Sequence, residues 1–503
     1  VKAPDATAKV VATADGAVRG VASGVGQAFL GIPFAVPPIG ARRFAPPAPT
    51  IAWQRVRDAT KLGPSCPQSR LPGPRSRSED CLTLNVYAPH DVVGSQRLPV
   101  MVWLYGGGLS GGGNGQYDPS GLAERQHVIV VTPNYRVGAF GYLAHPALAG
   151  AGEGNYGVLD QQAALRWVQT NIAAFGGDAG NVTLFGESAG SLSTCVQLAL
   201  PGAKRLFRRA ILQSDTCVIP DTTLPMADAR AGGEAMARDL GCADAATALA
   251  CLRHLPAGRI VAAKSHRRGN GGKDGWAPMT GGDVLPRSPK EIFAAGDGAN
   301  VPLLVGSNHD EGRLFADLLA FTLAMSTRGG YEKAVARALP GNIAPVLARY
   351  EDVAKDSYYR AFADIVTDSH FACPVLTLHR LLGKQAPFRA YEFVDLDAPL
   401  SLPRAPFTPK TGAYHASEIV YVFQRRWALA DPAKFDSAQR ALSDSMQDAW
   451  GAFARVGEPI APGGARWPAF DGQGPQLLTP DQRGAATDFA ERHRCDFWKD
   501  RGF

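Results

Sequence analysis

Ser188, within Gly186-Glu187-Ser188-Ala189-Gly190, is the residue best suited to covalent chemistry in this chain. An apolar, β-prone run at 181–185 precedes the pentapeptide, and a helix-compatible stretch follows it until Pro201-Gly202. A tight turn that pushes a serine hydroxyl outward leaves no room for side chains two positions away. In a chain with 56 glycines the pentapeptide alone easily arises by chance. Its strand–turn–helix context favours a nucleophile at Ser188.

The same turn supplies a donor for developing negative charge. The helix that begins after Ser188 has a positive end and free N–H groups, so the amide of Ala189 can face an oxyanion. A second glycine run, at 106–108, directly follows the apolar run 100–105. If that run is a strand, these glycines lie at its carboxyl end, where ligands of parallel sheets bind.

A serine nucleophile needs a general base and a carboxylate that orients this base. In α/β-hydrolases the acid and then the histidine follow the serine along the chain. Of the ten histidines, His415 has the best context, a glycine-containing loop past an expected strand. Asp310 and Glu311 both follow the buried run 301–306. A surface histidine and a solvated carboxylate are the alternatives, and spacing alone does not choose between the two acids.

The elements that position these residues alternate between strands and helices, which implies parallel crossovers and an α/β fold. The expected strands are 82–87, 100–105, 128–131, 182–185, 210–213, 301–306 and 388–393, after short strands within 9–34. Helices are expected at 160–171 and 437–455, and residues 313–385 are expected to be mostly helical. The Gly-rich, charged segment 267–275 is expected to be a mobile loop, since no phosphate-binding motif follows.

Composition favours a globular protein and gives no sign of a nucleic-acid partner. The 503 residues are 45% hydrophobic and 19% charged, and no apolar run reaches the roughly 18 residues of a membrane span. The net charge is +6, but the basic residues are dispersed and no zinc-finger spacing occurs. We therefore expect a monomer or weak dimer that acts on a small molecule, without metal or cofactor.

Eight cysteines are many for a cytosolic hydrolase. Cys66 and Cys81, and Cys242 and Cys251, bracket short loops without metal-binding spacing, which favours disulfides and an oxidising compartment over eight buried thiols. The chain begins with Val1 rather than an initiator Met. We expect a mature protein, secreted or periplasmic, from which a signal peptide has been removed.

Along nearly its whole length the chain resembles the type-B carboxylesterases, the α/β-hydrolase family that includes the cholinesterases, and most resembles a bacterial secreted member. The resemblance rests on the pentapeptide around Ser188 and on motifs at 29–35 (FLGIPFA), 78–85 (SEDCLTLN), 105–108 (YGGG), 134–136 (NYR), 155–161 (NYGVLDQ) and 175–178 (FGGD). It implies a mostly parallel central sheet with helices on both faces and long insertions forming a gorge. One catalytic domain, 1–503, is expected, with its core at about 80–215, 300–312 and 386–460 and insertions at about 221–300 and 313–385.

The resemblance also implies roles for individual residues. The family's acid lies in an Asp-Glu-Gly motif, which corresponds to Glu311, and its histidine lies in Gly-x-x-His, which corresponds to His415. Glu187 corresponds to a carboxylate that supports the site without being the triad acid. The oxyanion donors correspond to the N–H groups of Gly107, Gly108 and Ala189. The implied reaction is ester hydrolysis through an acyl-enzyme.

The family's disulfides correspond to Cys66–Cys81, Cys242–Cys251 and Cys373–Cys495. Cys195 and Cys217 remain, and we expect them to be buried thiols, with a fourth bridge as the less favoured alternative.

The chain departs from the cholinesterases where their substrate binds. A tryptophan of their first disulfide loop binds quaternary ammonium, whereas residues 67–80 contain no aromatic. Leu314 replaces a gorge aromatic, and two acyl-pocket phenylalanines correspond to Gly272 and Asp274. The residues expected to contact substrate are Arg70, Arg75, Arg77, Asp274, Arg313 and Leu314. We expect bulky or carboxylate-bearing esters, such as fumonisin tricarballylate side chains; solvated arginines, a lipase-like enzyme and a non-catalytic adhesion relative are the alternatives.

Overall fold

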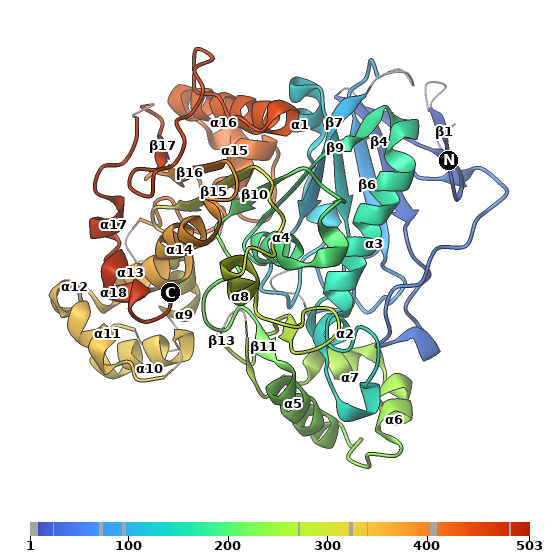
Figure 1. Ribbon diagram of the computed structural model, residues 1–503, viewed down its shortest axis with the longest axis horizontal. Coiled ribbons are helices and arrows are strands. Elements are labelled where there is room, and N and C mark those ends of the chain that lie inside the picture. Colours follow the sequence, from blue (N-terminus) through green and yellow to red (C-terminus); the bar gives the residue numbers. More distant parts are fainter. Residues whose placement is uncertain are drawn as a thin grey trace.

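The computed structural model describes residues 9–23, 25–69, 74–92, 97–269, 272–320, 325–339, 341–402, 410–481 and 484–503. A mixed ten-stranded sheet crosses the molecule (Figure 1), in the order β17-β16-β15-β10-β9-β7-β8-β6-β4-β3. Neighbouring strands from β17 to β8 run parallel, whereas β6, β4 and β3 pair antiparallel. The chain thus has the expected α/β-hydrolase architecture.

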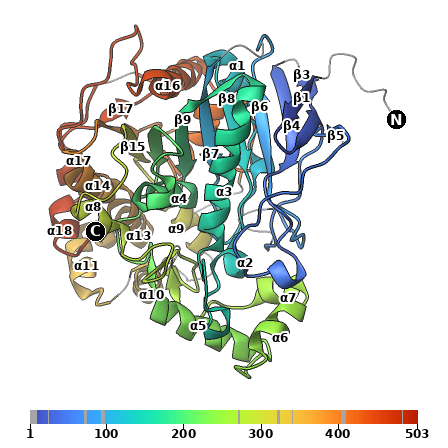
Figure 2. The same cartoon turned by 45° about the vertical axis from the view of Figure 1, so that its right-hand side comes forward.

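The strands run as follows: β3 Val21–Ser23, β4 Gly26–Pro33, β6 Thr83–Ala88, β7 Leu98–Leu104, β8 Ile129–Pro133, β9 Gly177–Glu187, β10 Arg209–Gln213, β15 Leu303–Asn308, β16 Phe388–Phe393 and β17 Gln476–Leu478. Figure 2 shows β3 and β4 at one end of the sheet and β15 and β17 toward the other. The central strands are continuous apolar runs because both faces of a parallel sheet are covered. Strands β1 Val10–Thr13, β2 Gly16–Arg19 and β5 Arg57–Asp58 form a small separate sheet.

Helices cover the sheet on both sides. Helices α3 (Tyr156–Asn171) and α4 (Ala189–Ala199) lie in front of the strands in Figure 1. Helices α1 (Ser120–Gln126) and α16 (Ser437–Val456) contact each other and pack on the other side, with α15 (Ile419–Phe423) beside α16. The predicted strands and long helices are confirmed, with ends that shift by a few residues.

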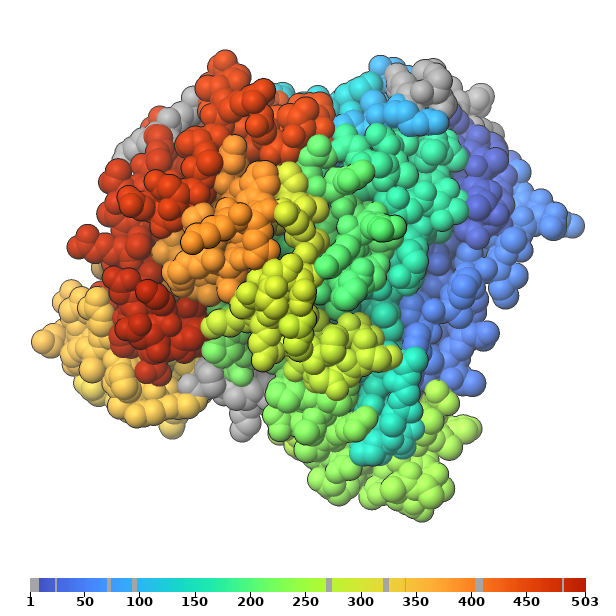
Figure 3. Space-filling model, viewed as in Figure 1, coloured from blue at the N-terminus to red at the C-terminus, as the bar shows by residue number. Residues whose placement is uncertain are grey.

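Two mainly helical segments lie in the chain between strands that are neighbours in the sheet. Between β10 and β15 lie β11 Leu224–Pro225, α5 Met226–Asp239, α6 Ala248–His254, α7 Ala257–Ala262, β14 Met279–Thr280 and α8 Pro289–Ala294. Between β15 and β16 lie α9 Gly312–Ala320, α10 Arg328–Ala338, α11 Ala344–Arg349, α12 Glu351–Asp356, α13 Tyr358–Val366, the π-helix η6 Thr367–Ala372 and α14 Cys373–Leu382. In Figure 3 the part of the first segment with α5–α7 lies at the lower edge of the molecule, and α10–α12 lie at its lower left. Helices α17 (Phe489–Arg492) and α18 (Cys495–Lys499) end the chain.

The segment 267–275 is more ordered than we expected from its composition. Strands β12 (Arg268–Gly269) and β13 (Gly272–Lys273) pair antiparallel. The base of this hairpin is held because Arg267 is buried, donates to the carbonyl of Tyr142 at 2.5 Å and stacks over Trp276. The prediction of a mobile loop is therefore wrong for the described part of the segment.

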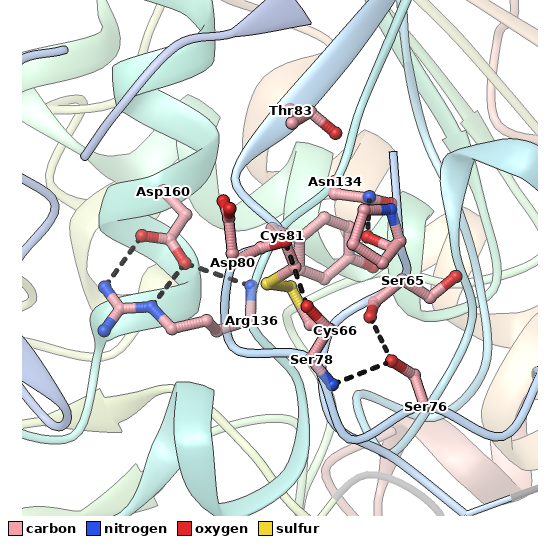
Figure 4. Close-up of a disulfide and its surroundings, with 12 residues drawn as sticks. Ser65, Cys66, Ser76, Ser78, Asp80, Cys81, Thr83, Asn134, Arg136 and Asp160 are labelled. Atoms are coloured by element: carbon pink, nitrogen blue, oxygen red, sulfur yellow. Dashed lines mark hydrogen bonds and ion pairs between the residues drawn. A yellow bond between two sulfur atoms is a disulfide. The ribbon is translucent and has the colours of Figure 1, made fainter. Parts of the chain in front are cut away.

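Four disulfides cross-link the chain. Three are the pairings that the family resemblance implies, Cys66–Cys81, Cys242–Cys251 and Cys373–Cys495. The fourth joins Cys195 on α4 to Cys217, which follows β10, so the expectation of two buried thiols is wrong. Figure 4 shows Cys66–Cys81 beside the buried ion pair of Arg136 and Asp160.

The loop closed by Cys66–Cys81 is held by hydrogen bonds as well. Ser76 Oγ donates to the carbonyl of Ser65 at 2.5 Å and accepts from the amide of Ser78 at 3.2 Å (Figure 4). Arg43 forms a bidentate ion pair with Glu79 at the base of the loop.

None of the helices in the described part of the chain combines the length and the hydrophobicity that a membrane span requires.

Candidate active site

Ser188 occupies the sharp turn between β9 and α4. Its backbone has φ 56° and ψ −128°, a strained conformation for a residue with a side chain. The turn is held because the Ser188 amide donates to the carbonyl of Gln213 and the Ser188 carbonyl accepts from the amide of Leu192, both at 2.9 Å. Glu187 and Ala189 are buried, whereas Ser188 is partly exposed. The serine is thus the accessible residue of this turn.

Glycines allow this turn to lie against the end of β7. A Cβ on Gly190 would overlap the carbonyl oxygen of Leu104, and a Cβ on Gly186 would lie 2.5 Å from the carbonyl oxygen of Gly190. A Cβ on Gly106 would lie 2.7 Å from Oε2 of Glu187. These close approaches explain in steric terms why Gly186 and Gly190 flank the serine.

His415 and Glu311 lie together although 104 residues separate them in the sequence. Nδ1 of His415 is 2.6 Å from Oε2 of Glu311, and the other carboxylate oxygen accepts the amide of Asn308 at 2.7 Å. Glu311 is fully buried and His415 is 6% exposed. Both oxygens of Glu311 therefore have partners, and this fixes the carboxylate against the imidazole.

Asp310 points to different partners. Its Oδ1 pairs with Arg313 at 2.8 Å and lies 3.1 Å from Nδ1 of His309, and its Oδ2 accepts the amide of Ala413 at 3.0 Å. Burial opposes the charged form, but the hydrogen bond from His309 and the nearby positive charges lower the pKa of Asp310. Asp310 thus joins the end of β15 to the loop that carries His415.

Glu187 approaches His415 from the nucleophile turn. Its Oε1 is 3.2 Å from Nε2 of His415. Burial raises the pKa of Glu187 well above its ordinary value, and the neighbouring carboxyl groups of Glu418, Glu311 and Asp215 raise it further. Burial and the neighbouring carboxyl groups therefore both oppose ionisation of Glu187.

Sequence reasoning missed two of these buried acids. Glu418 accepts from Asn308 Nδ2 at 2.6 Å and from Gln213 Nε2 at 3.0 Å, and burial raises its pKa. Asp215 accepts the amide of Thr216 at 2.7 Å, and burial raises its pKa well above the ordinary range. The sequence did give an indication for Asp215, because it follows the predicted strand 210–213 more closely than Asp310 and Glu311 follow the strand 301–306.

The glycine run after β7 forms a loop with positive φ angles. Gly107 has φ 117° and Gly108 has φ 61°, and a Cβ on Gly108 would meet no atom within 4 Å. The Gly107 carbonyl accepts from the amides of Ser110 and Gly111, which bends the loop. Within the described residues, no acceptor pairs with the N–H groups of Gly107, Gly108 or Ala189.

Known proteins resemble this chain over nearly its whole length. A model of the carboxylesterase family matches residues 7–498. The chain belongs to the carboxylesterase family. It is 36% identical to fumonisin B1 esterase of Sphingopyxis macrogoltabida, over 94% of this chain and 86% of that protein. It is also 36% identical to para-nitrobenzyl esterase of Bacillus subtilis (94% and 95%) and 34% identical to acetylcholinesterase of Bungarus fasciatus (97% and 85%). The protein is therefore a carboxylic ester hydrolase.

Aromatic rings cover the imidazole of this carboxylesterase. The ring centres of Phe315 and Phe371 lie 5.0 and 4.9 Å from that of His415. Sequence reasoning considered Leu314, which is buried, and missed both phenylalanines. Phe315 directly follows Leu314, so an aromatic was present one position after the residue that was considered.

Two of the arginines expected to contact substrate bind other groups of the protein. Arg313 pairs with Asp310, and Arg77 donates to the carbonyl of Gln68 at 2.7 Å. Arg75 is exposed, and Arg70 lies outside the described residues.

Asp274, also expected to contact substrate, lies at the base of the β12–β13 hairpin. Its Oδ1 accepts the amide of His266 at 3.2 Å. No contact among the described residues joins Asp274, Arg75 or Arg77 to Ser188, so these residues form no cluster with the serine.

In the described ranges, no group of three or more His, Cys, Asp or Glu side chains is arranged to hold a metal ion.

Proposed function

We propose that this carboxylesterase cleaves esters by two-step acyl transfer, with Ser188 as nucleophile, His415 as general base and Glu311 as the acid that orients the base. The observation that carries the proposal is the 2.6 Å contact between His415 and Glu311, at the same sheet edge as the strained Ser188 turn. The acid fixes the tautomer of His415, so that Nε2 carries the lone pair that can accept a proton. Oε1 of Glu187 lies 3.2 Å from this nitrogen.

In the first step Nε2 of His415 takes the Ser188 hydroxyl proton while Oγ bonds to the ester carbonyl carbon. The carbonyl oxygen becomes an oxyanion that accepts from the N–H groups of Gly107, Gly108 and Ala189. The carbon–oxygen bond to the alcohol then breaks, and His415 returns the proton to the departing oxygen. Water repeats the sequence on the acyl-enzyme and releases the acid. Glu187 supports the site as a buried acid beside His415.

Hydrolysis of p-nitrophenyl acetate by Ser188→Ala tests the nucleophile. We expect a loss of roughly 10⁶-fold in kcat, as when a serine hydrolase loses its nucleophile. Ser401→Ala, an exposed serine, is the matched control and keeps the wild-type rate. A Ser188→Ala enzyme that still turns over would overturn the proposal. An inactive wild type on every ester would instead favour the non-catalytic alternative.

We further propose that the substrates include carboxylate-bearing esters. Support comes from the 36% identity to a protein named fumonisin B1 esterase. The arginines at 70, 75 and 77 give the first disulfide loop its positive charge, although Arg75 and Arg77 do not contact Ser188. Paired neutral and anionic esters of equal size test this with the variant Arg70→Gln/Arg75→Gln/Arg77→Gln. We expect kcat/KM to fall for the anionic ester alone. An equal loss on both esters contradicts the idea.

The expected setting of the site also remains a proposal. The insertions 221–300 and 313–385 border the substrate gorge of one catalytic domain, and this domain acts as a monomer or weak dimer. Four disulfides support function in an oxidising compartment, outside the cell or in a periplasm.

A further inference from the structure

The π-helix η6 (Thr367–Ala372) lies between α13 and α14, where it widens an otherwise continuous helical run. Two hydroxyls within it bond back to carbonyls four residues earlier: Thr367 Oγ1 to Ala363 at 2.9 Å and Ser369 Oγ to Ile365 at 2.6 Å. Such bonds bend helices, and Pro374 lacks the N–H that a regular turn needs. Single turns of π-helix occur frequently at functional sites.

This turn contacts the candidate base through Phe371. The Phe371 ring centre is 4.9 Å from that of His415, and the two ring planes make an angle of 43°. Phe315, on α9, stacks on Phe371 at 5.8 Å and lies 5.0 Å from His415. Two stacked rings on two elements thus meet the same imidazole, and they limit both its rotation and its access to water.

The same turn contacts the residue next to the candidate acid. Thr367 Oγ1 accepts the amide of Gly312 at 3.0 Å, and Gly312 directly follows Glu311. Because the Thr367 hydroxyl proton is donated to Ala363, its lone pair is directed at Gly312. A Cβ on Gly312 would overlap the carbonyl oxygen of Ala363, so the chain after Glu311 lies directly against the end of α13.

A buried charge network anchors the turn from its other side. Asp368 lies between the Tyr350 hydroxyl, which donates at 2.5 Å, and Nδ1 of His493, at 2.7 Å. Nε2 of His493 lies 3.2 Å from Oε1 of Glu392 on β16, and Arg492 donates to the other oxygen of Glu392 at 2.8 Å. His493 is 4% exposed. The π-helix is thus tied to both the central sheet and the C-terminal segment.

We propose that η6 is the positioning element for the His415–Glu311 pair: Phe371 orients the imidazole, and Thr367 fixes the chain at Glu311. Asp368 holds η6 in register through His493. The proposal rests on the proposed triad. It makes Thr367 and Phe371 positioning residues, which act through the pair and not on the ester itself.

A matched pair of variants tests the acid side. Thr367→Val removes the oxygen that Gly312 needs and keeps the side-chain shape, whereas Thr367→Ser keeps the oxygen. We expect kcat for p-nitrophenyl acetate to fall about tenfold in Thr367→Val, as for a buried donor left without its partner, with KM little changed. Thr367→Ser is expected to restore the rate. Each rate is normalised to the fraction of enzyme that one equivalent of an organophosphate inactivates.

The base side has a readout of its own, the separate effects of Phe371→Leu on kcat and on KM. Loss of the Phe371 ring leaves Phe315 alone against the imidazole, so kcat is expected to fall while KM stays near the wild-type value. Glu311 and Glu187 face the imidazole in wild type and variant alike. Phe470→Leu is the control, since Phe470 packs on a different histidine, His379, at 4.8 Å.

The outcomes separate this inference from the proposed triad. An active Ser188→Ala enzyme would remove the basis of both. An inactive Ser188→Ala enzyme with unchanged kcat in both Thr367→Val and Phe371→Leu overturns the positioning role alone. If Phe371→Leu does not fold, the comparison of Thr367→Val with Thr367→Ser decides: equal kcat values in the two overturn the role, and a specific loss in Thr367→Val supports it.

Discussion

Asp310 and Ala413 are joined by two hydrogen bonds, one between backbone groups and one to the Asp310 carboxylate. The amide of Asp310 donates to the carbonyl of Ala413 at 2.9 Å, and the amide of Ala413 donates to Oδ2 of Asp310 at 3.0 Å. Ala413 lies two residues before His415, so this link sets the histidine loop at the end of β15. The next residue, Glu311, is thereby left to contact the imidazole. The adjacent acids thus have separate tasks, one in the loop and one at the histidine.

Because the two acids have different partners, we expect isosteric substitutions at Glu311 and Asp310 to lower kcat by very different factors. Glu311→Gln is expected to lower kcat about 10⁴-fold, because an amide favours the wrong tautomer of His415. Asp310→Asn keeps an oxygen for the amide of Ala413 and is expected to stay within about tenfold of wild type. Steady-state hydrolysis of p-nitrophenyl acetate measures both. A larger loss in Asp310→Asn than in Glu311→Gln would reverse the assignment of the acid.

His493 predicts how stability depends on pH. Burial opposes its charged form, but hydrogen bonds to Asp368 and Glu392 and their charges raise its pKa from 6.5 to about 9. The stability from this shift is fully present below pH 6.5 and is lost as pH rises through about 9. We expect the urea midpoint to fall between pH 7 and pH 10, and to fall less steeply in His493→Gln. Equal slopes in the two proteins would contradict a charged His493.

Much of this arrangement is predictable from the sequence, for identifiable physical reasons. The central strands are buried on both faces, so they appear as unbroken apolar runs, and the Ser188 turn has its glycines at fixed spacing. Contacts that depend on tertiary packing were missed. The bridge from Cys195 to Cys217 forms because α4 packs on β10, and Phe371 reaches His415 only through a π-helix. No local pattern encodes either of these contacts.

Gly107→Ala tests the proposed oxyanion donors. Alanine disfavours the φ of 117° at this position, so the backbone must turn and its N–H groups lose their direction. We expect kcat to fall about 10²- to 10³-fold, the usual effect of one lost oxyanion donor. Gly464→Ala, at φ 84° in open space, is the control for left-handed strain and keeps kcat. Wild-type kcat in Gly107→Ala would exclude this loop from the oxyanion site.

The Cys195–Cys217 disulfide, which the sequence did not favour, is expected to contribute to the stability of the fold. Cys195–Cys217 closes 22 residues and ties α4, which begins next to Ser188, to the chain after β10. Cys195→Ala/Cys217→Ala is expected to lower the free energy of unfolding by about 2–5 kcal/mol, since the unfolded chain gains freedom. Cys242→Ala/Cys251→Ala opens a loop of only 9 residues and is expected to cost less. Urea unfolding of both variants measures the difference, and a greater loss for the shorter loop would show that loop closure is not what stabilises this region.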